Sequence, residues 1–206
     1  MMIRMIGTLG AVLVVALGTT TAMAAGSAAA GKDKAAVCQG CHGEKGISVD
    51  PNTYPNLAGQ FSGYIKKQIL DFQAGRRNDD TMSAMAATVA SKEDLEDIAA
   101  YFSTQKPMKG VGGKDNKAGK QIFSEGVPTA GVYGCKNCHG EKGRGKAPDN
   151  HLFPVIGGQN KAYLVKQLKD LKAGVRTNDP AGMMNDIAKK LTDKQIEAVS
   201  EYIANL

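Results

Sequence analysis

The sequence CQGCHGEKG occupies residues 38–46, and a near copy, CKNCHGEKG, occupies residues 135–143. The two copies hold all four cysteines and two of the three histidines of a 206-residue chain. The similarity continues further on, because YPNLAGQFSGYIKKQILDFQAGRR at 54–77 faces FPVIGGQNKAYLVKQLKDLKAGVR at 153–176. A repeat of about 100 residues is too long for a solenoid, so the chain contains one domain written twice.

Each copy is predicted to be helical. After Ser91, a helix-capping residue, apolar residues recur at the spacing of one helix face, and a matching pattern follows Thr192. Further helices are expected at 62–74 and 161–173, each followed or ended by a glycine, and the first helix of each copy should carry its cysteines. Stretches dense in Gly, Pro and Asn are expected to be loops. The fold class is therefore all-α, with two small, loop-rich domains.

The domain boundaries follow from the repeat and from composition. We expect the first domain at 25–105 and the second at 120–206. The segment between them, KPMKGVGGKDNKAG at 106–119, is rich in Gly and Lys and lacks an apolar period, so it is predicted to be a linker.

Residues 1–24 are typical of a secretory signal peptide. Arg4 precedes an apolar run, and the small residues Ala22 and Ala24 precede the expected cleavage before Ala25. The alternative is an uncleaved membrane anchor, but the run is shorter than the roughly 20 residues that cross a bilayer and glycines interrupt it. We therefore expect a protein exported from the cytoplasm, in a bacterial periplasm.

The repeated C-x-x-C-H pattern predicts two covalently bound haem c groups. Residues three apart lie on one face of a helical turn, so Cys38 and Cys41 point the same way, and His42 follows directly. Two such thiols form thioethers with the haem vinyl groups, and the adjacent histidine binds the iron. Cys135, Cys138 and His139 repeat the arrangement in the second copy.

Composition agrees with haem. The chain has no Trp and 5% aromatic residues, which is little bulk for two small cores, and an apolar macrocycle would supply it. A thioredoxin-like redox pair is the first alternative, but it normally accompanies a βαβ pattern and leaves the following histidines unexplained. Zinc is the second alternative, but His151 is the one histidine left over for two sites.

Methionines before the last helix of each copy are candidates for the second axial ligand. Aligning the copies puts Met82 opposite Met184 and Met85 opposite an isoleucine, so Met82 and Met184 are the predicted ligands. A thioether is the soft ligand that raises a haem's potential. Met183 is an alternative in the second domain and Met85 in the first, and methionine is also a common filler of apolar cores.

Three further features have both functional and structural interpretations. The carbonyls of Pro55 and Pro154 could accept from the ring N–H of the ligating histidines, or the prolines could simply stiffen a turn. Arg77 and Arg176 occupy matching places and could pair with haem propionates, or could be solvated residues after a helix. His151, without a counterpart in the first copy, is expected to be a surface loop residue.

Charge is distributed unequally between the copies. Residues 25–105 carry 8 Lys and Arg against 10 Asp and Glu, whereas residues 106–206 carry 17 against 10. A polarised molecule can be steered towards its partner in a salt-dependent way. We expect the Lys-rich second domain to dock on an acidic partner or an anionic membrane surface, and we expect no nucleic-acid partner because the chain shows no recognition motif.

Taken together, the motifs and their order closely resemble the dihaem cytochrome c4 family over residues 25–206. The resemblance implies two class I cytochrome c domains packed as a pseudo-symmetric pair, with His/Met ligation of each iron and the two haems approaching through their propionate edges. It also implies a periplasmic electron carrier between respiratory complexes, with a quinol–cytochrome c oxidoreductase or another donor and a haem-copper terminal oxidase as acceptor. Members are often associated with the membrane surface.

A carrier without a small-molecule substrate is the first functional hypothesis, and it is not an enzyme. A dihaem peroxidase-like enzyme is an alternative, but it would need an open iron position and acid–base groups. An electron-accepting subunit of a sulfur-oxidising dehydrogenase is another alternative, which would look the same in sequence.

Overall fold

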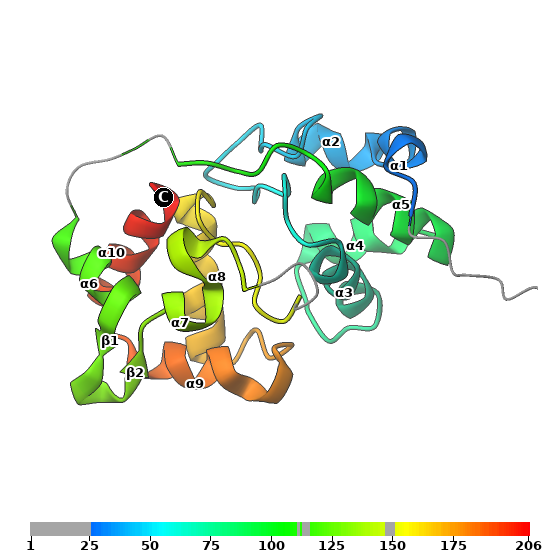
Figure 1. Ribbon diagram of the computed structural model, residues 1–206. Helices are drawn as coiled ribbons and strands as arrows, with labels where there is room; N and C mark the ends of the chain where they lie inside the picture. The colour runs from blue at the N-terminus through cyan, green and yellow to red at the C-terminus, as the bar shows by residue number, and fades with distance from the viewer. Residues whose placement is uncertain (1–25, 111, 113–115, 147–150) are drawn as a thin grey trace, which may run out of the picture.

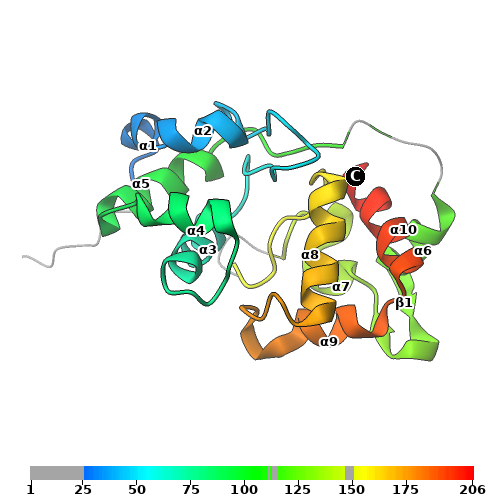
Figure 2. The same ribbon diagram turned by 180° about the vertical axis from the view of Figure 1, so that it is seen from behind.

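The computed structural model describes residues 26–110, 112, 116–146 and 151–206. These residues form two helical units that lie side by side (Figures 1 and 2). The first unit contains the helices α1 (Ala28–Lys34), α2 (Ala36–His42), α3 (Ser62–Gln73), α4 (Asp80–Ala87) and α5 (Lys92–Ser103). The second contains α6 (Lys117–Glu125), α7 (Lys136–His139), α8 (Lys161–Ala173), α9 (Met183–Lys190) and α10 (Asp193–Ala204). The all-α prediction is confirmed.

Both units repeat one plan, in which the first and last helices cross and the third helix packs beside the last. In the first unit, α1 crosses α5 at Gly31, where a Cβ atom would lie 2.0 Å from the backbone oxygen of Asp97. In the second, α6 crosses α10 at Gly119, where a Cβ atom would lie 2.3 Å from the backbone oxygen of Ala198. Glycine is therefore needed at both crossings because the backbones touch.

The expected helix ends are present. Ser91 accepts from the backbone N–H of Asp94 at the start of α5, and Thr192 forms a reciprocal capping box with Gln195 at the start of α10. Gly75 follows α3 and Gly174 ends α8, both with the left-handed backbone that glycine adopts without strain.

Each unit has a small apolar core of its own. The first consists of Ala35, Ile65, Ile98, Ala99, Tyr101 and Phe102. The second consists of Ile122, Phe123, Val132, Leu164, Leu191, Ile196, Val199 and Ile203. Such small cores are marginal for independent units of this size, which agrees with the expectation that a covalently bound apolar group completes them.

The second unit also contains features that the helical pattern did not predict. A two-residue antiparallel pair, β1 (Gly126–Val127) and β2 (Val132–Tyr133), follows α6. Short 3₁₀ turns occupy Pro128–Ala130, Glu141–Gly143 and Pro180–Gly182. Strands of two residues are too short to show a period-2 pattern, so sequence periodicity does not reveal them.

The segment predicted as a linker, 106–119, packs against both units in its described part. Met108 is fully buried, and its backbone N–H donates to the oxygen of Ala58 at 3.1 Å. Two residues later, Gly110 donates to the oxygen of Leu206 at 2.8 Å. Helix α6 begins at Lys117, inside the segment. The connection that follows α5 is therefore part of the folded structure along most of its described length (Figure 1).

The predicted signal peptide, residues 1–24, lies outside the described residues. Within the described part of the chain, none of the helices is both long enough and apolar enough to span a bilayer.

Candidate haem sites and the interface between them

The cysteines and histidines of each C-x-x-C-H copy lie on a short helix, as expected. Cys38, Cys41 and His42 lie on α2, and the histidine is 5% exposed. In the second unit α7 carries Cys138 and His139, while Cys135 is the residue before the helix and has helical backbone angles.

The cysteines of the two motifs do not form disulfides. All four lie in described residues, and Cys138 is the exposed one. Burial raises the pKa of Cys38, with a smaller contribution from Cys41, and burial raises the pKa of Cys135 to about 11. A thioredoxin-type pair depends on a lowered thiol pKa, so the site does not have the electrostatics of a redox-active dithiol.

Each histidine is oriented by a proline carbonyl. Nδ1 of His42 lies 2.8 Å from the oxygen of Pro55, and Nδ1 of His139 lies 2.9 Å from the oxygen of Pro154. A carbonyl oxygen only accepts, so Nδ1 carries the proton and Nε2 keeps the lone pair that binds a metal. The predicted hydrogen bonds are therefore present in both units.

Burial keeps both rings neutral. It lowers the pKa of His42 and of His139, and the hydrogen bonds to the proline carbonyls offset only part of that effect. A neutral imidazole with a fixed tautomer is the form that ligates iron.

Met82 is the third residue of α4 and Met184 is the second residue of α9, so both lie in the first turn of their helix. Both side chains are half-buried, Met82 on α4 and Met184 on α9. The backbone N–H of Met82 donates to Oδ1 of Asp79 at 3.1 Å, and that of Met184 donates to Oδ2 of Asp179 at 2.6 Å. The neighbouring Met183 is 42% exposed.

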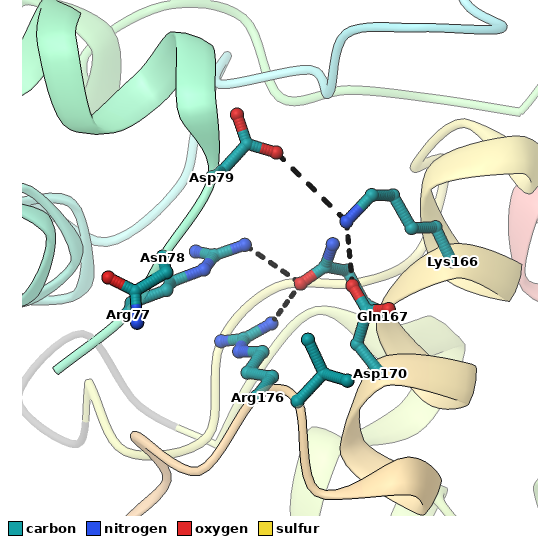
Figure 3. A pocket seen from close by; sticks show the side chains of 8 residues that line it. Arg77, Asn78, Asp79, Lys166, Gln167, Asp170 and Arg176 are labelled. Carbon is teal, nitrogen blue, oxygen red and sulfur yellow. Dashed lines mark hydrogen bonds and ion pairs between the residues drawn. The ribbon is translucent and has the colours of Figure 1, made fainter. Parts of the chain in front are cut away.

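The side chains of Arg77 and Arg176 each reach from their own unit to the other one. Figure 3 shows both guanidinium groups directed at Gln167 of α8, whose Oε1 accepts from each at 2.8 Å. Nη2 of Arg77 also donates to the hydroxyl of Tyr163 at 3.0 Å, and Nη2 of Arg176 donates to the hydroxyl of Tyr64 at 3.1 Å. The interpretation of Arg77 as a solvated residue is wrong, because it is 8% exposed and its guanidinium lies over the ring of Phe72.

The two arginines create a positive site at the interface. Burial alone would raise the pKa of Tyr163, but the charges of Arg77 and Arg176 outweigh it and lower that pKa. The carboxylates of Asp79 and Asp170 line the same pocket and balance part of this positive charge. Pairing with haem propionates stays a prediction.

His151 lies in a turn, as expected, but it also contacts the other unit, which was not expected. Its side chain is half-buried, and its ring lies against Gly63 of α3, where a Cβ atom would be 3.0 Å away. The contact between a loop of one unit and a helix of the other depends on how the units dock, which no local pattern reveals.

A second set of interface residues was also missed from the sequence. Gln60 and Gln159 are each 5% exposed, and each binds the backbone of the opposite unit. Gln159 pairs with both backbone groups of Asn56 at 2.8 and 2.9 Å, and Gln60 pairs with both of Val155 at 3.0 and 2.8 Å. The alignment of the two copies pairs the two glutamines and so marks them as equivalent residues. It does not show what they bind.

Family models match both units. The model described as "Cytochrome c" matches residues 116–206, and that described as "Cytochrome C oxidase, cbb3-type, subunit III" matches residues 23–102. Cytochrome c4 of Pseudomonas aeruginosa is 44% identical over 197 residues, which cover 94% of this chain and 96% of that protein. The chain belongs to the cytochrome c4 family.

Solved and curated relatives agree with this assignment. The crystal structure of reduced recombinant cytochrome c4 from Pseudomonas stutzeri superimposes with a TM-score of 0.82 at 43% identity, over 88% of this chain and 100% of that one. The thiosulfate dehydrogenase electron acceptor of Thiomonas intermedia is 34% identical, over 93% of this chain and 88% of that protein.

As a cytochrome c4, the protein is a dihaem electron-transfer cytochrome with two covalently bound haem c groups in two cytochrome c domains. The donor sets in the structure fit these groups, because each unit presents two cysteines that are not in disulfides and a histidine whose Nδ1 is bound and whose Nε2 is available. A zinc centre does not fit, since the described residues contain no group of three or more Cys, His, Asp or Glu side chains that could hold a metal.

Proposed function

We propose that this cytochrome is a periplasmic electron carrier whose irons are both closed by His/Met ligation. The covalent attachment residues are Cys38 and Cys41 for the first haem and Cys135 and Cys138 for the second. The axial ligands are His42 and Met82, and His139 and Met184. The observation that carries this assignment is the identical support behind both histidines, where a proline carbonyl holds Nδ1 in each unit.

Haem supplies one-electron chemistry when it is bound, and the protein contributes orientation and environment. The proline carbonyls fix the rings of His42 and His139 and raise their basicity. The side chains of Asp79 and Asp179 accept from the backbone N–H groups of Met82 and Met184, and this similar support favours the two methionines as the ligands. A thioether opposite imidazole favours the ferrous state and raises the potential. With both axial positions filled, no substrate is bound.

The carrier is proposed to act between respiratory complexes after export. Residues 1–24 would be removed as a signal peptide, leaving domains at 25–105 and 120–206 joined by 106–119. Electrons would arrive from a quinol–cytochrome c oxidoreductase or a similar donor and leave to a haem-copper terminal oxidase. The charge difference between the halves supports docking through the Lys-rich second domain, which would also bind an anionic membrane surface.

The similarity to the Thiomonas intermedia protein favours a second candidate, an electron acceptor for a thiosulfate-oxidising dehydrogenase. The two candidates differ in donor, not in site chemistry. Stopped-flow reduction by a purified thiosulfate dehydrogenase, compared with oxidation by a terminal oxidase, separates them: a carrier of the respiratory chain reacts rapidly with the oxidase and slowly with the dehydrogenase.

The first test is the absorbance spectrum of the dithionite-reduced protein, quantified per polypeptide, before and after carbon monoxide. Two c-type haems without a rapid change support two closed irons and a pure carrier. A rapid change at one haem contradicts the proposal, because it reveals an open position of the kind that a peroxidase-like enzyme needs.

A further inference from the structure

Gln60 and Gln159 make the same pair of hydrogen bonds in opposite directions across the interface. Oε1 of Gln159 accepts from the backbone N–H of Asn56 at 2.8 Å, and its Nε2 donates to the oxygen of Asn56 at 2.9 Å. Oε1 of Gln60 accepts from the N–H of Val155 at 3.0 Å, and its Nε2 donates to the oxygen of Val155 at 2.8 Å.

A second donor fixes which end of each amide is the oxygen. Oε1 of Gln159 also accepts from the N–H of Asn160 at 2.9 Å, and Oε1 of Gln60 accepts from the N–H of Phe61 at 3.0 Å. An atom that receives two backbone N–H groups must be the acceptor oxygen, so the orientation of both side chains follows from their partners.

The peptide groups that the glutamines bind are the ones that hold the histidines. The oxygen of Pro55, which lies 2.8 Å from Nδ1 of His42, and the N–H of Asn56 belong to one peptide unit. The oxygen of Pro154 and the N–H of Val155 form the equivalent unit behind His139. Each histidine is thus joined to a glutamine of the other domain through one peptide and two hydrogen bonds.

We propose that Gln159 and Gln60 are cross-domain positioning residues, each lowering the reduction potential of the haem in the opposite domain by polarising the proline peptide that supports its histidine. This inference rests on the proposed function, because it takes His42 and His139 as the iron ligands.

The sign follows from the direction of the bonds. When the N–H of Asn56 donates to Gln159, electron density in that peptide shifts towards the oxygen of Pro55 and makes it a stronger acceptor, since chained hydrogen bonds reinforce each other. A stronger acceptor for Nδ1–H makes His42 a more basic ligand. A more basic imidazole stabilises ferric iron and so lowers the potential. Both glutamines are 5% exposed, so water is poorly placed to replace them.

The test is a pair of reciprocal substitutions in the full-length haem protein. Gln159→Leu should shift the potential of the first-domain haem to a more positive value and leave the second-domain haem nearly unchanged. Gln60→Leu should do the opposite. Each haem's redox state is followed by NMR through the signals of its own axial ligands, and in the reduced protein the Nδ1–H resonance of the affected histidine should move upfield as its hydrogen bond weakens.

Two control variants separate polarisation from loosening of the interface. Asn160→Ala removes the 2.7 Å hydrogen bond from Asn160 to the oxygen of Tyr54 and the 3.2 Å one from Nδ2 of Asn56 to Oδ1 of Asn160, which join the same segments but do not involve the peptide group between Pro55 and Asn56. It should leave both potentials in place. Gln159→Glu keeps an acceptor oxygen for Asn56, so the potential of the first haem should stay at or below the native value.

The inference is overturned if the leucine variants leave both potentials unchanged, shift both haems equally, or shift the haem of their own domain. It is also overturned if Asn160→Ala or Gln159→Glu reproduces the positive shift. Failure of the proposed function is seen separately, because the haem count and the carbon monoxide spectrum of the unmodified protein would then show a missing haem or an open iron.

Discussion

At the scale of single residues, the choice between two adjacent methionines illustrates what decides a ligand. Met184 is half-buried and its backbone is held by Asp179, whereas Met183 is 42% exposed. A side chain that closes an iron must point into the unit, so the more exposed neighbour is the poorer candidate.

The matched pair Met184→Ala and Met183→Ala tests this assignment. Met184→Ala should lower the potential of the second haem by on the order of 0.1 V, a part of the roughly 0.8 V that axial ligands span, and should let carbon monoxide bind to the reduced protein. Met183→Ala should change neither property. Spectroelectrochemistry and the carbon monoxide spectrum measure both, and the opposite result would make Met183 the ligand.

At the scale of helices, close crossings set the geometry of each unit. Gly31→Ala should lower the free energy of unfolding by about 1–3 kcal/mol, because its Cβ would collide with the backbone of α5 and force the helices apart. Gly40→Ala is the matched control on α2, where a Cβ meets nothing within 4 Å, and it should be neutral or stabilise by up to about 1 kcal/mol. Urea unfolding followed by circular dichroism measures both.

A buried carboxylate, that of Asp97, lies where α1 crosses α5. Asp97 accepts from Nζ of Lys34 and from the backbone N–H of Ser27, both at 2.6 Å, and these hydrogen bonds lower its pKa. A carboxylate with a lowered pKa stabilises the fold above its ordinary pKa of about 3.9, and this contribution is lost as the pH falls through the folded-state value.

Asp97→Asn should therefore lower the melting temperature at neutral pH. The difference from the native protein should shrink as the pH falls below about 4, because both proteins then lack the charge. Thermal unfolding followed by circular dichroism between neutral and acidic pH checks this. A difference that is constant with pH would show that the carboxylate's charge contributes nothing.

Features that depend on nearby residues could be predicted from the sequence, whereas contacts between the two units could not. The haem motifs and the helices after Ser91 and Thr192 depend on neighbours within one or two turns, so local spacing reveals them. Gln60, Gln159 and His151 act across the interface, and their partners are about 90 to 100 residues away in the chain. The repeat aligns Gln60 with Gln159, but this alignment does not show which groups the two side chains contact.

At the scale of the whole molecule, the main difference between the two halves is their net charge. If the Lys-rich second half docks first, electron transfer to an acidic partner should slow as ionic strength rises. Lys189→Glu, at an exposed position on α9, should slow the second-order rate severalfold at low salt, whereas Lys32→Glu, at an exposed position on α1, should have a smaller effect. Stopped-flow kinetics with a terminal oxidase measure this, and equal effects would remove the preference for the second half.

The folded connection between the units affects how strong the interface between them has to be. Met108 anchors the connection to the first unit and Gly110 anchors it to the second, so the contact between the two halves is intramolecular. The hydrogen bonds of the glutamines and arginines across the interface then form within one molecule, without the entropy cost of bringing two free partners together. Covalent linkage, and not the affinity of the interface, keeps the two redox centres together, so the contact between the units can consist of polar groups.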